Sequence, residues 1–111
     1  MTANEYQKLA LRTARTDLDS TQLLLNAALG LTGESGEVAD GVKKHIFQDH
    51  WLDVGATARE LGDVAWYLAL AAHAIGYDLD TIFQINIDKL KARYPDGFSA
   101  DKSINRKEGD T

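Results

Sequence analysis

The sequence lacks cysteine altogether and contains a single proline, Pro95. Without cysteine, neither a disulfide framework nor a thiolate metal site can form, which suits a reducing compartment. Residues 1–10 are polar and lack the apolar core of a secretory signal. The longest strongly apolar stretch, residues 64–75, contains His73 and is too short to span a bilayer. We therefore expect a cytoplasmic protein with no membrane partner.

Positive charge is also scarce, since 12 basic residues stand against 17 acidic ones for a net charge of −5. This balance argues against broad nucleic-acid binding, which needs a basic surface. An anionic small substrate stays possible, because a bound metal ion can invert the local charge. The sequence has no Walker-type phosphate loop, and its three histidines have no partner four residues away, which argues against a zinc site.

Strand-like alternation and internal repeats are absent, whereas helical periodicity runs through nearly the whole chain. A chain of 111 residues fits one domain. We therefore predict an all-α fold, a four-helix bundle over residues 1–98, followed by a polar, flexible tail over residues 99–111. The expected helices span residues 4–15, 21–47, 54–75 and 81–93.

Helix boundaries are marked by capping residues. Asp53 is placed to cap the third helix, and Gly76 to end it. Asp78 or Asp80 caps the fourth, which stops at the turn residues 94–97. The second helix is apolar on more than one side, so we predict that a second subunit completes the bundle. Its apolar residues include Leu23, Leu24, Leu25, Ala27, Ala28, Leu29 and Leu31.

Two acidic pairs stand out on the expected second and third helices, Glu34 with Glu37 and Glu60 with Asp63. Spacing of three residues puts both members of a pair on one helical face. The 22 residues from Glu37 to Glu60 allow an antiparallel helix–helix contact, so the pairs can meet. On spacing alone, solvated surface acids are the more frequent outcome in a chain this acidic.

The surroundings of the pairs favour a metal site. Glu34 and Glu37 lie among glycines and small residues within GLTGESGEVAD, residues 30–40. Small residues let another helix or a ligand approach the backbone closely. Four carboxylates around one cavity repel one another unless a cation neutralises them. Oxygen-only ligands favour Mg²⁺, or Mn²⁺ as a substitute, over zinc.

The stretches GLTGESGEVAD (30–40) and RELGDVAWYLA (59–69) resemble the E-x-x-E and E-x-x-D motifs of the MazG-like all-α nucleoside triphosphate pyrophosphohydrolases. NIDKLKARYPDGF (86–98) resembles the segment that follows in that family. The resemblance implies Mg²⁺-dependent hydrolysis of a (d)NTP to the monophosphate and pyrophosphate, in a homodimer or dimer of dimers. It also implies a metal-ligand set of Glu34, Glu37, Glu60 and Asp63.

The chemistry requires charge neutralisation, alignment and an activated water, and Mg²⁺ supplies much of all three. A carboxylate that is not committed to the metal can deprotonate the water. Glu34 and Glu37 are both candidates for this role. Candidate substrate-binding residues are Asn86, Lys89, Arg93 and Tyr94 on and after the fourth helix, with Lys44, Trp51 and Asn26 elsewhere.

Each of these substrate-binding candidates also has a structural interpretation. Asn86, Lys89 and Arg93 can form a solvated helix face, and Lys44 can pair with Glu37. Trp51 can stack on a base or close the end of the bundle. Trp66 and Tyr67 lie within an apolar stretch and are expected in the core.

Two other functions compete with nucleotide-pool control or clean-up. One is a narrower pyrophosphatase for dUTP, dCTP, a modified nucleotide or a phosphoribosyl nucleotide. The other is a non-catalytic helical interaction module whose acids are merely solvated. Activity on a panel of substrates distinguishes the narrower enzyme from the general one. Stabilisation by Mg²⁺ distinguishes a metal-binding enzyme from the non-catalytic module.

Overall fold

The computed structural model describes residues 1–111 and contains helices but no β-strand, which confirms the predicted all-α class. None of the helices has both the length and the apolar character that a bilayer crossing requires. The elements in chain order are α1 (Ala3–Ala10), the 3₁₀ turn η1 (Leu11–Thr13), α2 (Ser20–Phe47), α3 (Val54–Ala74), α4 (Leu79–Arg93) and α5 (Ala100–Ile104).

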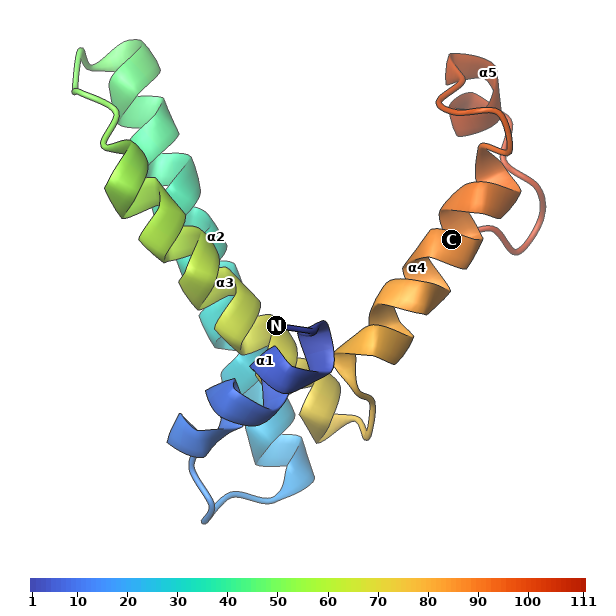
Figure 1. Cartoon of the computed structure of the whole chain (residues 1–111). Coiled ribbons are helices and arrows are strands. Elements are labelled where there is room, and N and C mark those ends of the chain that lie inside the picture. The colour runs from blue at the N-terminus through green and yellow to red at the C-terminus, as the bar shows by residue number, and fades with distance from the viewer.

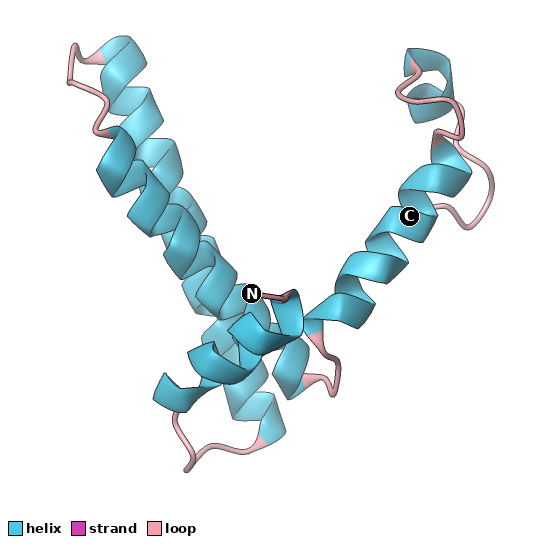
Figure 2. Ribbon diagram, in the orientation of Figure 1, coloured by secondary structure: helices cyan, strands magenta, loops and turns pink.

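The helices form a V rather than a closed bundle (Figure 1). Helices α2 and α3 run antiparallel as one arm, α4 and α5 form the other arm, and α1 crosses near the vertex (Figures 1 and 2). The radius of gyration is 17.0 Å, whereas a compact chain of this length has about 13 Å. The two arms therefore leave much of their surface uncovered within one chain.

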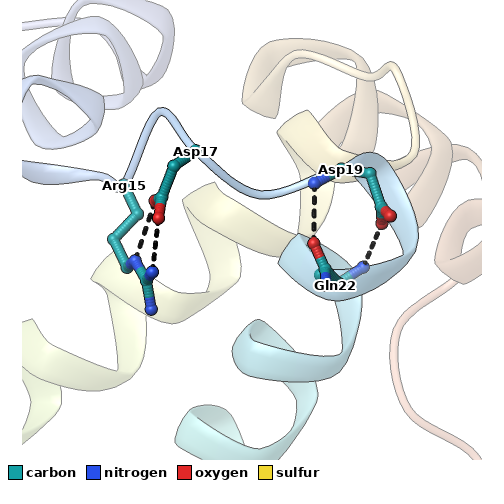
Figure 3. A network of polar contacts seen from close by, with 4 residues as sticks. All are labelled: Arg15, Asp17, Asp19 and Gln22. Carbon is teal, nitrogen blue, oxygen red and sulfur yellow. Dashed lines mark hydrogen bonds and ion pairs between the residues drawn. The ribbon is translucent and has the colours of Figure 1, made fainter.

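Aspartates cap the three long helices. Asp19 and Gln22 form a reciprocal capping box at the start of α2 (Figure 3), with N–H···O distances of 2.8 and 3.0 Å. The neighbouring Arg15 and Asp17 form an ion pair in the preceding connection (Figure 3). The expected cap of the third helix, Asp53, accepts from the N–H of Ala56 at 2.9 Å.

The start of α4 agrees with expectation, whereas the first helix and the segment after α4 differ from it. Of the two candidate caps for α4, Asp78 is the one used, and it accepts from the N–H of Thr81 at 2.8 Å. The first helix continues past Ala10 only as a 3₁₀ turn. The sequence pattern predicts no helix after Arg93, yet α5 forms there and Ser99 caps it.

A buried glutamine holds the vertex together. The side chain of Gln7 on α1 is 6% exposed and donates to the carbonyls of Ala69, at 3.1 Å, and Tyr77, at 3.3 Å. Its carbonyl oxygen accepts from the N–H of Leu79 at 3.0 Å, at the start of α4. One side chain thus ties α1 to the end of α3 and to the start of α4. Because Gln7 is polar, the apolar pattern of α1 did not predict this role.

The core at this vertex is small. Only 6 of 111 residues are buried, and Leu70 is the largest fully buried side chain. Ala69, Ala72 and Leu79 form the buried cluster, with Tyr6 and Leu68 packed against it. Such a core gives little hydrophobic stabilisation to an isolated chain.

We expect Gln7→Ala to destabilise the protein by about 2 kcal/mol, because it leaves buried backbone groups without partners. Urea unfolding followed by circular dichroism measures this change. The matched control is Gln84→Ala, which removes an exposed glutamine bonded only to Asp88 and should change stability by less than about 0.5 kcal/mol. Equal effects of the two substitutions would contradict the role of Gln7.

Candidate metal centre

Three of the four predicted acidic ligands meet between α2 and α3. Each of Glu34, Glu60 and Asp63 offers a carboxylate oxygen, and these oxygens lie within 4.8 Å of one another. Glu34 and Glu60 are half-buried, and Asp63 is exposed. The fourth, Glu37, is exposed on the next turn of α2 and lies outside this cluster.

The cluster raises the pKa of Glu34. Hydrogen bonding to Glu60 is the largest cause, and burial and the charges of Asp63, Glu60 and Glu37 add to it. Two neighbouring carboxylates can be ionised together only at an electrostatic cost, which is why the pKa of Glu34 lies above its ordinary value. A divalent cation among these oxygens would remove the cost. The all-oxygen donor set fits Mg²⁺ or Mn²⁺.

Gly30 permits the close helix contact behind the cluster. A methyl group at this position would approach carbons of the Tyr67 ring to between 2.1 and 2.4 Å, well inside van der Waals contact. Because Gly30 has no side chain, the ring of Tyr67 on α3 can lie against the backbone of α2. Gly33 and Gly36 have no atom near the corresponding positions, so nothing in the single chain explains them.

Tyr67 also packs edge to face against Trp66, with ring centroids 5.0 Å apart. The indole N–H of Trp66 lies 3.0 Å from both the carbonyl of Ala10 and the hydroxyl of Thr13. Both aromatic side chains are half-buried, so they take part in helix packing but lie at the edge of the predicted core rather than inside it.

Tyr6 on α1 is a neighbour of the cluster that the sequence analysis missed as a site residue. Its phenol pKa is raised by burial and by the negative charge of Asp63. The helical pattern of α1 does place Tyr6 on an inward side, but no sequence spacing links residue 6 to residue 63. Only the crossing of α1 over α3 brings the two groups near one another.

The remaining candidates on the α2–α3 arm are arranged as follows. Lys44 pairs with Asp40 at 2.7 Å rather than with Glu37, and Asp40 and Glu37 both raise its pKa. Trp51, in the connection between α2 and α3, is 90% exposed and does not close the end of the bundle. Asn26 is exposed on α2.

The candidates on the other arm are separated from the acidic cluster. Helix α4 diverges from the α2–α3 hairpin (Figure 1), so Asn86, Lys89 and Arg93 do not join the acids within one chain. Asn86 is exposed, while Lys89 and Arg93 contact the C-terminal segment. The half-buried Tyr94 lies below the Arg93 guanidinium, whose carbon is 5.9 Å from the ring centroid.

Similarity to known proteins covers the part of the chain that carries the acidic cluster. The sequence matches the MazG nucleotide pyrophosphohydrolase domain over residues 22–98, a range that contains the whole acidic cluster and α4. The chain therefore belongs to the MazG family. It is also 38% identical over 97 residues to the Gene 37 protein of Mycobacterium phage L5, covering 81% of this chain and 82% of that protein. No solved structure matches it significantly.

We expect Mg²⁺ to stabilise the protein, since it should bind the folded cluster and not the unfolded chain. At a free concentration of 100 times Kd the gain is about 2.7 kcal/mol, which thermal melts at constant ionic strength will detect. Glu60→Gln should lose most of this gain, whereas the control Glu5→Gln on α1 should keep it. Equal stabilisation of all three proteins by Mg²⁺ and by NaCl at matched ionic strength would contradict a built metal site.

Proposed function

We propose that the protein is a Mg²⁺-dependent nucleoside triphosphate pyrophosphohydrolase that converts a (d)NTP to the monophosphate and pyrophosphate. The observation that carries this proposal is the convergence of Glu34, Glu60 and Asp63 within 4.8 Å, in a chain of the MazG family. Control or clean-up of the nucleotide pool is the corresponding role. Mn²⁺ is the expected substitute metal.

Each acidic residue has a distinct place in this proposal. Glu34, Glu60 and Asp63 would hold the metal, and bound Mg²⁺ would neutralise phosphate charge and polarise the scissile anhydride. Glu37 stays outside the cluster and lies one turn from Glu34. It is therefore the carboxylate left to accept a proton as water attacks the α phosphorus and pyrophosphate leaves.

We further propose that the working form contains at least two copies of the chain. The accessible surface is 8165 Å², whereas a compact monomer of this mass exposes about 6,100 Å². The excess of about 2,000 Å² is what one partner contributes to a large, obligate interface. The exposed apolar side chains include Leu25, Leu29 and Ile46 on α2, which are 60%, 66% and 61% exposed.

A second copy would also complete the substrate site. Helix α4, which carries Asn86, Lys89 and Arg93, diverges from the α2–α3 hairpin that carries the acids (Figure 1). An α4 arm packed against the partner's hairpin would bring these side chains toward that hairpin. There they, with Tyr94, would hold phosphates, while Lys44, Trp51 and Asn26 would contact other parts of the nucleotide.

The reaction is tested by pyrophosphate release from each (d)NTP in the presence of Mg²⁺. We expect Glu37→Gln to lower kcat by about 10²-fold or more, as for loss of a general base. Asp63→Asn should be comparably impaired through weaker metal binding, and Glu5→Gln should retain activity. Undiminished release from the first two variants would refute the site, and orthophosphate as the product would refute the reaction.

The assembly is tested by sedimentation equilibrium, in which we expect at least twice the chain mass of 12.2 kDa. The double variant Leu25→Gln/Leu29→Gln should shift the distribution toward monomer, because it places polar groups in the proposed apolar contact. Lys8→Gln on α1 is the control and should leave the mass unchanged. A wild-type protein that sediments as a monomer at all concentrations would contradict the proposal.

A further inference from the structure

The segment after α4 folds back onto its own helix and covers Arg93. The Arg93 side chain is 9% exposed and donates two hydrogen bonds to the Asp110 carboxylate, at 2.8 and 2.6 Å. One turn earlier, the Lys89 ammonium donates to the backbone carbonyl of Thr111 at 2.7 Å. Oxygen atoms of this segment thus accept hydrogen bonds from two cationic side chains of α4.

The same fold-back forms a partly open cationic cavity. The cavity has a volume of about 340 Å³ and lies between the end of α4, α5 and the last residues. Its charged lining consists of Arg93, Lys102, Arg106, Lys107 and Asp110. Four positive groups therefore face one negative group, in a chain whose net charge is −5.

Asp110 neutralises only part of this charge. Its carboxylate is committed to Arg93, whereas Lys102, Arg106 and Lys107 form no ion pair. Neighbouring like charges destabilise a fold unless an anion offsets them. The planar guanidinium of Arg93 presents the fork that matches a phosphate as well as a carboxylate.

We propose that this cavity binds a linear oligophosphate, and that the Asp110 carboxylate stands in for one phosphoryl group on Arg93. Incoming phosphate displaces Asp110 from the guanidinium, while Lys102, Arg106 and Lys107 neutralise the remaining charge. The C-terminal segment is then an internal competitor for the anion. The choice of ligand rests on the proposed function, which supplies two sources of this chemistry, the nucleoside triphosphate and the pyrophosphate product.

An internal competitor lowers the apparent affinity for the ligand by the fraction of molecules in which the site is free. Replacing Asp110 by asparagine keeps the shape of the side chain and removes its charge. The substitution should therefore tighten oligophosphate binding. A purely structural ion pair predicts the opposite, since its loss would loosen the segment that carries three of the four cations.

The test is calorimetric titration of the full-length protein with inorganic pyrophosphate in EDTA, at constant ionic strength. Without divalent metal, the acidic cluster should repel the probe rather than bind it. We expect Asp110→Asn to bind pyrophosphate about fivefold more tightly than wild type, equivalent to roughly 1 kcal/mol. Glu108→Gln removes the same charge from the same segment without touching Arg93, and should bind as wild type does.

A second pair of variants tests the cavity from its cationic side. Lys102→Gln should weaken pyrophosphate binding severalfold, whereas Lys91→Gln, on α4 outside the cavity lining, should not. The proposal is overturned if Asp110→Asn binds no more tightly than wild type, or if Lys102→Gln and Lys91→Gln have equal effects.

A parallel titration with a non-hydrolysable nucleoside triphosphate identifies the source of the anion. Tighter binding than that of pyrophosphate assigns the site to the nucleotide, and equal or weaker binding assigns it to the product. Because these titrations contain no metal and read binding directly, they can succeed even if no (d)NTP is hydrolysed. Failure of the cavity proposal and failure of the enzymatic proposal are therefore distinguishable.

Discussion

The site depends on the mutual repulsion of carboxylates that meet at the contact between two antiparallel helices. Glu34, Glu60 and Asp63 converge at the α2–α3 contact, and the pKa of Glu34 rises, chiefly through its hydrogen bond to Glu60. Tyr67 lies across Gly30 at the same helix contact, where the two helices come close together. The strain among the acids is what a divalent cation would relieve.

A second feature of the chain is that its helices are long while its buried core is small. Helices α2 and α3 have 28 and 21 residues, yet only 6 of 111 residues of the chain are buried. The vertex is held by a few specific contacts, above all the hydrogen bonds of Gln7. Apolar side chains along both arms remain exposed, which favours association. In the proposed assembly, the same association that covers these faces also supplies phosphate-binding groups to the acids.

Charge is divided along the chain in a way that matches this proposal. The α2–α3 arm presents carboxylates suited to a cation, while the end of α4 and the segment after it present Arg93, Lys102, Arg106 and Lys107, suited to an anion. A metal–nucleotide complex has both kinds of charge. Asp110 pairs with Arg93, so the cationic end is neutralised in part by the chain itself. In the proposed function, metal and phosphate would thus be recognised by different arms of the V.

By itself the sequence determined the helical class, the Asp53 cap and the pairing of acids on helical faces, because these depend on residues within a few positions of one another. It also pointed to the MazG family, to which the chain belongs. Tertiary structure alone decided that Glu37 lies outside the cluster, that Tyr6 approaches Asp63 and that Asp110 holds Arg93. Those outcomes depend on how helices cross and where the chain folds back. Local periodicity contains no information on contacts between residues so far apart in the chain.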